Sequence, residues 1–522
     1  MNTQDLTGRD QAEVVISGAG PNGLLLAGEL ALAGVRPVVL EQLTEPSSEL
    51  KANGIIGQVH RVLDMRGLYQ LLTGSGAPPQ PLDGHIFAGM RVPFTGVAHN
   101  PMYGMFIKQP QVVRRLTDWV RGLGVEIRWG HRLADVVQTH GGVELGVESP
   151  HGNYRQGAAY LIGADGGRST VRKLMGIGFP GITSAVVARV GHVAIPDRLR
   201  VQGALDVPGL GRIPFGHNRF DRGVLIYMEF EPGRPMVGTI EYGTLLPDDA
   251  PPMTVDELRD SVTRILGVEV PMEPPPGPGP HALRRINGQN TRQAEQYRVG
   301  NVFLIGDAAH VHSALGGPGL NLGMQDAMNL GWKLAAAVHG WAPTGLLDTY
   351  HSERHPAGER VLMQSMAQTA LLAGGPEIGA LRTLVGELLA TTAGAEHIAH
   401  VLAGADVRYD VRDRHPLSGR LVPEVVFDDG RRVADLMRAG RPVLLDLDGG
   451  AHAAAALDWR DRVDLITAAT AATSERPAPA LLIRPDGYVA WAATESSSDD
   501  HERLRRALVR WFGERHARLA YA

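Results

Sequence analysis

The chain has 522 residues, of which 43% are hydrophobic and 20% are charged, the composition of a soluble globular protein. Its length predicts about three domains. The net charge of −5 at pH 7 provides no basic field that would attract nucleic acid or an anionic membrane. Because the sequence contains 0 cysteines, disulfides, thiolate metal sites and dithiol redox chemistry are excluded. Without a long apolar run or a signal peptide, we expect a cytoplasmic protein with no membrane partner.

The N-terminal segment has the pattern of a βαβ unit. A buried strand is expected at residues 13–17, followed by the glycine motif GAGPNG at 18–23 and an apolar helix at 24–33. A second strand at 35–40 ends at Glu41. This succession predicts a Rossmann-like dinucleotide-binding unit, whereas a glycine turn by itself would also be consistent with a structural role.

The residues of this motif match the needs of dinucleotide binding. Gly18 permits a tight turn, Gly20 lets the backbone approach a pyrophosphate, and Gly23 allows close packing of helix on strand. The helix N-terminus, where Pro21 lies, faces the phosphates. Glu41 can accept hydrogen bonds from the adenosine ribose hydroxyls.

A second motif, GADGGRSTVR at residues 163–172, follows an expected strand at 160–162. Asp165 begins a tight turn, and a helix begins near Ser169. Taken alone, the segment could equally be an ordinary strand–turn–helix with an aspartate cap.

A third motif, IGDAAHVHSALGGPGLN at residues 305–321, lies between an expected strand at 301–305 and a helix at 322–338. Asp307 can hydrogen-bond the ribityl hydroxyls of a flavin. The helix N-terminus would face the flavin pyrimidine edge and stabilise the anion that forms there on reduction. The expected contact residues of this loop are Gly319, Leu320 and Asn321. An aspartate cap with a glycine-rich loop is the alternative, but the three motifs in order predict one FAD molecule.

No metal site is predicted. His310 and His312 stand two positions apart, but no nearby acid completes a tetrahedral set of ligands. No side chain is assigned as a catalytic acid or base, because the cofactor carries the chemistry of a flavoenzyme.

The middle of the chain predicts an antiparallel sheet that would carry the substrate. Strand-like runs separated by Gly, Pro and Asn occur at residues 186–196, 211–215, 223–229 and 236–242. Thr254 and Glu257 form a capping-box signature for a helix that ends at Gly267. The candidate substrate residues are Phe215, Tyr227, Met228 and Tyr242. Alternating aromatic residues on a strand are also common in plain cores, so that interpretation stays open.

The last part of the chain, from about residue 406, is expected to form a separate domain. Strands are expected at 443–446, 480–484 and 488–491, with helices at 459–471 and at the C-terminus. The final helix would place Leu504, Leu508 and Trp511 on one side. This pattern resembles a thioredoxin-like domain that, without cysteine, has a structural or oligomeric role.

The three motifs resemble the fingerprints of the group A flavoprotein monooxygenases, the single-component family related to para-hydroxybenzoate hydroxylase. The similarity covers nearly the whole chain, through the segments RVLDMRGL (61–68), FIKQPQVVRRL (106–116), NLGMQDAMNLGWKLA (321–335), LLDTYHSERHP (346–356) and HPLSGRLVPE (415–424). The subgroup that it resembles consists of bacterial enzymes that tailor aromatic polyketides.

The resemblance implies an α/β fold with three domains. A discontinuous Rossmann-like FAD-binding domain would span 12–180 and 286–400, a mixed-sheet α+β substrate domain 181–285, and a thioredoxin-like α/β domain 406–522. It implies noncovalent FAD, NADPH as co-substrate, O₂, and hydroxylation of an aromatic polyketide through a flavin C4a-hydroperoxide. Baeyer–Villiger insertion, or a non-catalytic flavin-binding or ligand-binding protein, are the alternatives. A homodimer is possible in this family.

The resemblance also implies roles for individual residues. It places Gln109 on the flavin side, and Asp165 and Arg172 in a shared FAD and nicotinamide surface. Four positions depart from the family pattern: Lys51 and Gln58 replace arginines, Ala314 replaces proline, and Pro318 replaces glutamine. Lys51 keeps a positive charge but lacks the planar guanidinium fork, so these departures predict an altered environment of the flavin ring.

Overall fold

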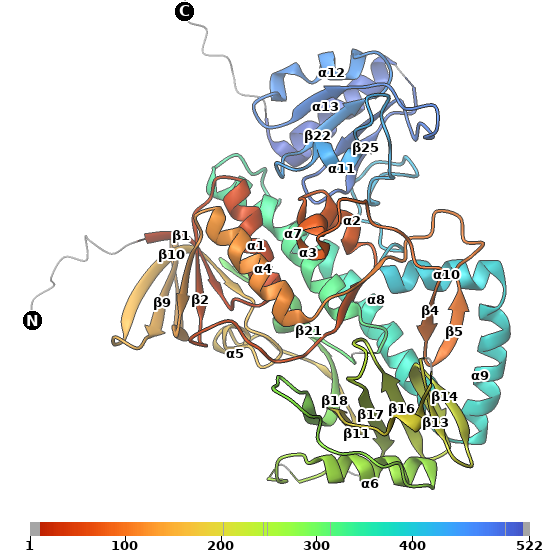
Figure 1. Cartoon of the computed structure of the whole chain (residues 1–522). Coiled ribbons are helices and arrows are strands. Elements are labelled where there is room, and N and C mark those ends of the chain that lie inside the picture. The colour runs from red at the N-terminus through yellow and green to blue at the C-terminus, as the bar shows by residue number, and fades with distance from the viewer. Residues whose placement is uncertain are drawn as a thin grey trace, which may run out of the picture.

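The computed structural model describes residues 11–201, 203–243, 245–247, 249–313, 315–495 and 497–514 (Figure 1). Ala314 and the last residues of the expected C-terminal domain lie outside the described residues. Within those ranges, no helix is both long enough and apolar enough to cross a membrane.

The first layer is a mostly parallel sheet with the order β19-β20-β10-β1-β2-β7. Its strands are β1 (Gln11–Ser17), β2 (Pro37–Glu41), β7 (Glu126–Trp129), β10 (Tyr154–Gly163), β19 (Arg298–Val299) and β20 (Val302–Leu304). The antiparallel hairpin β8 (Arg132–Thr139) and β9 (Gly142–Glu148) extends it from β10. Strand β1 pairs in parallel with both β2 and β10, as a Rossmann-like unit requires.

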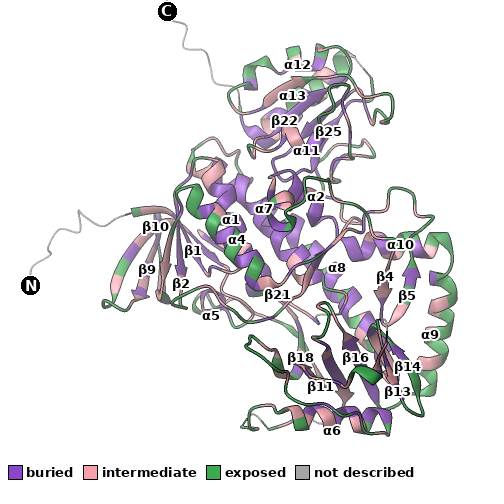
Figure 2. Ribbon diagram, in the orientation of Figure 1, coloured by how far each residue is buried: buried purple, intermediate pink, exposed green. Residues whose placement is uncertain are grey.

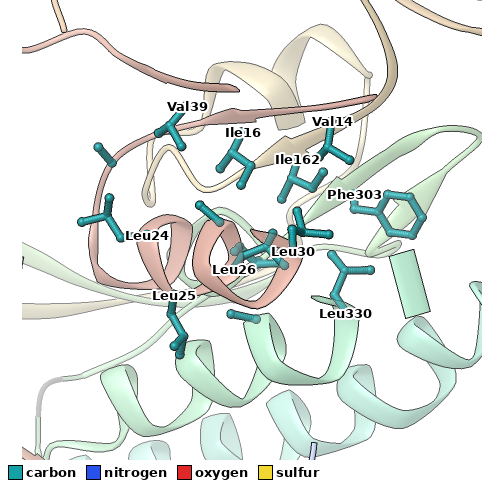
Figure 3. Packing of buried hydrophobic residues seen from close by; sticks show 14 of the residues in the cluster. Val14, Ile16, Leu24, Leu25, Leu26, Leu30, Val39, Ile162, Phe303 and Leu330 are labelled. Atoms are coloured by element: carbon teal, nitrogen blue, oxygen red, sulfur yellow. The ribbon is translucent and has the colours of Figure 1, made fainter. Parts of the chain in front are cut away.

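Helices α1 (Pro21–Leu32), α4 (Gln109–Gly122) and α7 (Pro318–Val338) pack together beside this sheet. Figure 3 shows Ile16 and Ile162 of the strands above Leu26 and Leu30 of α1, with Leu330 of α7 below. Because α7 is buried nearly all round, it is a core helix, whereas α9 (Pro376–Leu389) is largely exposed (Figure 2).

The second layer is an antiparallel sheet with the order β15-β16-β17-β11-β18-β21. Its strands are β11 (Gly181–His192), β15 (Gly216–Phe220), β16 (Gly223–Met228), β17 (Met236–Tyr242), β18 (Leu283–Gln293) and β21 (His310–Val311). Since β21 belongs to the third glycine motif, this motif is joined directly to the sheet through its pairing with β18. A smaller sheet beside it contains β12 (Arg200–Val201), β13 (Ala204–Val207) and β14 (Gly211–Pro214).

Helix α6 (Val255–Leu266) packs on one face of the second sheet. As predicted, the Thr254 hydroxyl accepts a hydrogen bond from the Glu257 backbone N–H, and Gly267 ends the helix in the left-handed conformation. The Glu257 carboxylate does not complete the capping box, because it binds Arg189 and Arg285.

Further elements connect and cover these two layers. The helices are α2 (Val59–Asp64), α3 (Leu68–Thr73), α5 (Thr170–Leu174), α8 (Asp348–Leu372) and α10 (Thr392–Ala403). Two small antiparallel pairs are formed by β3 (Gly54–Ile56) with β6 (Gly104–Phe106), and by β4 (Gly84–Phe87) with β5 (Met90–Pro93).

The C-terminal part folds around its own sheet, in the order β23-β22-β24-β25. Its elements are α11 (Val433–Leu436), β22 (Val443–Asp446), α12 (Ala451–Ala455), β23 (Asp464–Thr467), β24 (Ala480–Ile483), β25 (Val489–Ala492) and α13 (Ser498–Phe512). Leu504, Leu508 and Trp511 are buried on one side of α13, as predicted.

The helix expected at 459–471 is wrong. The chain there forms a short 3-10 turn, η3 (Leu457–Trp459), followed by strand β23, which pairs in parallel with β22. A helical spacing of apolar residues exists in this segment, but hydrogen bonds to the neighbouring strand satisfy its backbone, so tertiary pairing overrides the local pattern.

Candidate flavin site

The nucleotide loop between β1 and α1 is packed against other backbone atoms at two of its glycines. A Cβ at Gly18, whose φ is +114°, would lie 2.4 Å from the Ala164 carbonyl oxygen. A Cβ at Gly23 would lie 2.1 Å from the Gly18 carbonyl oxygen. At Gly20, by contrast, a Cβ would meet nothing within 4 Å. The loop is therefore fixed by its first and last glycines and open at the middle one, beside Pro21 at the start of α1.

Glu41, at the end of β2, is attached to this loop. Its Oε2 accepts the Ala19 N–H at 2.8 Å, and its Oε1 accepts the Leu43 N–H at 2.9 Å. An ionised carboxylate has about four acceptor positions, so two remain available for hydroxyl groups of a ligand.

Asp165 has one oxygen in use and one without a partner. Its Oδ2 accepts the backbone N–H groups of Thr170 and Val171 at 2.7 and 3.0 Å, which is the helix cap considered as the alternative from sequence. Its Oδ1 is buried and has no hydrogen-bond partner among the residues that the structure describes. A buried carboxylate oxygen without a donor is costly, so this atom favours a ligand hydroxyl or water there.

Arg172 lies inside the protein, and its expected place in a shared FAD and nicotinamide surface stays a prediction. It is 5% exposed, and it donates to the carbonyl oxygens of Ala308 and Gly167 at 2.9 Å each. Its guanidinium carbon lies 3.7 Å from the centroid of the Phe179 ring. Arg172 thus braces the second motif against the third.

Asp307 is exposed although its neighbours Gly306 and Ala308 are buried. The turn that carries Asp307 is anchored to the buried Asp326, because the Gly306 N–H donates to Asp326 Oδ2 at 3.1 Å. His310 Nε2 lies 2.7 Å from the same oxygen, so its partner is a carboxylate and not a metal. Within the described residues, no group of three His, Asp or Glu side chains could hold a metal ion.

The glycine-rich loop leads into the first turn of α7. Gly317 is the N-cap residue, and Gly319 and Leu320 are half-buried. The Asn321 side chain is turned inward, where its Oδ1 accepts the Val59 N–H at 3.2 Å and its Nδ2 donates to the Ala403 carbonyl at 3.2 Å. Backbone N–H groups of this first turn therefore remain for an anionic ligand.

The Lys51 loop and Gln109 adjoin one another, because the Gln109 N–H donates to the Ala52 carbonyl at 2.9 Å. Lys51 pairs with the exposed Glu49 at 3.2 Å. Gln58 is buried and donates to the Gly404 carbonyl at 2.7 Å. The glutamine that replaces the family's arginine at this position thus bonds the protein backbone at Gly404.

Tyr227 is a core residue, which agrees with the alternative interpretation of the aromatic residues on these strands. It is 1% exposed, packs in the cluster between the sheet and α6, and donates to Glu229 Oε2 at 2.9 Å. Met228 and Tyr242 lie on the opposite face, since side chains alternate along a strand and Tyr242 packs with the other cluster. Burial raises the pKa of Tyr242 to about 12, against the opposing effect of Arg219 and Arg382.

An exposed aromatic cluster stands beside this face, and sequence periodicity did not reveal two of its members. The Phe215 and Phe230 ring centroids are 5.4 Å apart, and those of Phe106 and Phe230 are 5.5 Å apart. Phe106 is 79% exposed. The segment before Gln109 reaches the substrate sheet here through an ion pair of Lys108 Nζ with Glu231 at 2.5 Å. In the sequence, the only indication of a role for Phe106 was its position three residues before Gln109, which was expected on the flavin side.

The residues present fit a flavin dinucleotide. The space at Gly20, the remaining acceptor positions of Glu41, the unpartnered oxygen of Asp165 and the exposed Asp307 provide what a pyrophosphate and a series of hydroxyls need. The free N–H groups at the start of α7 suit the flavin ring, which becomes anionic on reduction.

Two families match the sequence. Residues 11–365 match the FAD binding domain family, and residues 415–514 match the C-terminal domain of aromatic-ring hydroxylases. The chain is 39% identical to 12-dehydrotetracycline 5-monooxygenase/anhydrotetracycline 6-monooxygenase of Streptomyces rimosus, over 96% of this chain and 99% of the relative. It is 37% identical to rifampicin monooxygenase of Streptomyces venezuelae, over 96% and 98% of the two chains.

A similar solved structure is that of CabE, an aromatic hydroxylase from angucycline biosynthesis. It has a TM-score of 0.85 and 34% identity, and the match covers 97% of this chain and 100% of CabE. These findings confirm the expected fold class and the expected cofactor, FAD. The chain therefore belongs to the FAD binding domain family and is a flavin-dependent monooxygenase with an aromatic-ring hydroxylase C-terminal domain.

Proposed function

We propose that this enzyme transfers one oxygen atom from O₂ to an aromatic polyketide, with NADPH as the reductant and ring hydroxylation as the main outcome. The names of the relatives support the substrate class, because they act on tetracycline-type and angucycline-type compounds. We also infer that residues 12–180 and 286–400 bind FAD, that 181–285 hold the substrate, and that 406–522 form the appended domain.

The observation that carries the substrate class is the exposed cluster of Phe106, Phe215 and Phe230. Large aromatic side chains on a protein surface mark a binding site when they are contiguous. Their rings offer flat faces and edges on which a fused-ring molecule can stack. Met228 and Tyr242, on the adjoining sheet face, extend this surface.

FAD, when bound, supplies the redox chemistry, accepting hydride from NADPH and reacting with O₂. The open backbone at Gly20 and the N-terminus of α1 bind the pyrophosphate, and Glu41 binds the ribose. Asp307 binds the ribityl hydroxyls. The first-turn N–H groups of α7 stabilise negative charge at the pyrimidine edge.

The proposal is tested by incubating the holoenzyme with NADPH and a panel of multi-ring polyketides, followed by mass spectrometry and NMR. A product one oxygen heavier, with a new phenol or alcohol carbon, supports hydroxylation. A new ester or lactone would indicate Baeyer–Villiger insertion instead. Absence of NADPH-dependent oxygen uptake with every compound would favour a non-catalytic binding protein. NADPH as the co-substrate, a homodimer and a cytoplasmic location stay predictions.

The role of the aromatic cluster has its own test. Phe106→Ala should raise KM for the polyketide and leave FAD affinity unchanged. Leu210→Ala is the matched control, because Leu210 is also exposed on the substrate side but lies outside the cluster. Equal kinetics of the two variants would remove the cluster from the substrate site.

A further inference from the structure

The C-terminal domain is joined to the flavin-binding part through a stacked pair of tyrosines. Tyr488 lies in the turn between β24 and β25 and is 2% exposed. Its ring stacks on that of Tyr409, with centroids 4.2 Å apart and an interplanar angle of 25°. Two chains of hydrogen bonds lead from this pair, and each ends at the third glycine motif.

The first chain begins at the Tyr488 hydroxyl, which donates to Gln325 Oε1 at 3.1 Å. Gln325 Nε2 donates to Asn321 Oδ1 at 3.0 Å, in the first turn of α7. The Tyr488 hydroxyl also accepts a hydrogen bond, from Gln58 Nε2 at 3.2 Å. All of these side chains are buried, so water is a poor substitute for any of them.

The second chain begins at the Tyr409 hydroxyl, which accepts a hydrogen bond from Arg354 Nη1 at 3.0 Å. Arg354 Nε donates to Asp326 Oδ1 at 2.7 Å, and Asp326 Oδ2 accepts the Gly306 N–H at 3.1 Å. Burial would raise the pKa of Asp326, but Arg354 and His310 hold it below its ordinary value. The carboxylate is therefore ionised, and it holds the turn that carries Asp307.

A buried ion cluster fixes the position of the tyrosine pair. Arg484, on the C-terminal side, binds both oxygens of Glu353 at 2.7 and 2.8 Å. Lys333 of α7 binds Glu353 Oε2 at 2.7 Å. Burial raises the pKa of Glu353, but Arg484 and Lys333 outweigh this effect and lower it to about 2. The cluster thus links Arg484 on the C-terminal side to Glu353 of α8 and to Lys333 of α7.

We propose that the C-terminal domain sets the geometry of the flavin-binding loops, with Tyr488 and Tyr409 as positioning residues. The inference rests on the assignment of these loops to FAD. Each tyrosine hydroxyl holds a buried polar side chain in one orientation, and that side chain holds the first turn of α7 or the turn at Gly306. Removing the Tyr409 hydroxyl takes away the acceptor of the buried Arg354 Nη1. Removing the Tyr488 hydroxyl leaves Gln325 Oε1 with only the longer bond from Gln58 Nε2, at 3.3 Å. In both cases the side chain is held less firmly, and the loop relaxes toward other arrangements. The domain thus acts on the cofactor site without any electron transfer of its own.

The test uses the full chain with Tyr488→Phe, which removes the hydroxyl and keeps the ring stack. We expect the Kd of FAD to rise about three- to tenfold, which is the loss of one buried hydrogen bond. The midpoint potential of the bound flavin should also shift, because the N–H groups that face it are displaced. Tyr409→Phe breaks the second chain and should weaken FAD binding in the same direction.

Arg432→Gln is the matched control. Arg432 joins the C-terminal side to Asp64, the last residue of α2, by an ion pair of 2.7 Å that involves no residue of the third motif. It should lower thermal stability while the Kd of FAD and the flavin potential stay those of the parent. Unchanged Kd and potential in both tyrosine variants would overturn the proposal. So would an equal change in Arg432→Gln, because the domain would then act through stability alone. FAD binding is measured without substrate, so this result is independent of the proposed oxygenation.

Discussion

The nucleotide loop and the substrate face differ in how much freedom their atoms have. In the loop, one added methyl group at Gly23 would lie 2.1 Å from a carbonyl oxygen. On the substrate side, Phe106 is 79% exposed, and its ring packs against that of Phe230. The cofactor is the same in every relative of an FAD family, so its loop can be tightly packed at Gly18 and Gly23 and open only at Gly20. The substrate face has to accept a ligand of its own, and it stays open.

The largest effect is expected from Gly23→Ala. The added methyl group meets backbone and not a flexible side chain, so it should destabilise the protein by at least about 1–3 kcal/mol even without FAD. Gly20→Ala is the matched variant, because it meets nothing within 4 Å in the protein. It should unfold like the parent when FAD is removed but bind FAD weakly. Thermal unfolding of apo and holo forms distinguishes the two, and equal apo stability would contradict the tight packing of the loop.

Folding stability should also fall at acidic pH, because of the buried His60. Burial lowers the pKa of His60 to about 4, against the opposing hydrogen bond to the Gly57 carbonyl. The folded state thus binds fewer protons than the unfolded state between about pH 4 and 6.5, and stability is lost as pH falls through this window. The slope is about 1.4 kcal/mol per pH unit. Denaturant unfolding at several pH values should show a shallower slope for His60→Asn, whereas His397→Asn, at an exposed site, should match the parent.

Asp307→Asn should separate FAD affinity from the stability of the apo protein. The residue is exposed, so the apo protein should keep its stability, whereas FAD affinity should fall by about 1.5–3 kcal/mol through loss of a charge-assisted hydrogen bond. Glu41→Gln should lower both quantities, because Glu41 also holds the Ala19 and Leu43 N–H groups. Fluorescence titration with FAD provides the affinities. Normal affinity in both variants would argue against their placement at the cofactor.

The smallest effect is expected at the substrate face. Tyr242→Phe should change KM for the polyketide by a factor of a few, the effect of about 1 kcal/mol. Tyr227→Phe should leave KM unchanged and reduce stability, because its hydroxyl bonds Glu229 behind the sheet. Steady-state kinetics of the pair measure the difference, and the reverse pattern would place the substrate on the α6 side.

Sequence reasoning was strongest where a motif dictates local backbone. It identified the tight packing at Gly18 and Gly23, the helix cap at Thr254 and the buried side of α13, because each depends on residues close in the chain. The approach of a pyrophosphate to Gly20 stays a prediction. The FAD family and the fold class followed from the three motifs in order.

It was wrong or incomplete where the determining contact is distant. The orientation of Tyr227 depends on strand register and on α6, the burial of Arg172 depends on the carbonyl of Ala308, and β23 forms because β22 is beside it. Phe106 was missed because its significance comes from Phe230, a residue far along the chain. The tyrosine pair at Tyr409 and Tyr488 is another such contact.

The central claim is tested most directly by one turnover experiment under ¹⁸O₂. The purified holoenzyme, NADPH and an accepted polyketide are incubated with labelled oxygen, and the product is analysed by mass spectrometry. A flavin-dependent monooxygenase predicts one ¹⁸O atom in each product molecule, with NADPH consumed in proportion. A product that carries no ¹⁸O would contradict the account, whether the reaction was assigned as hydroxylation or as insertion.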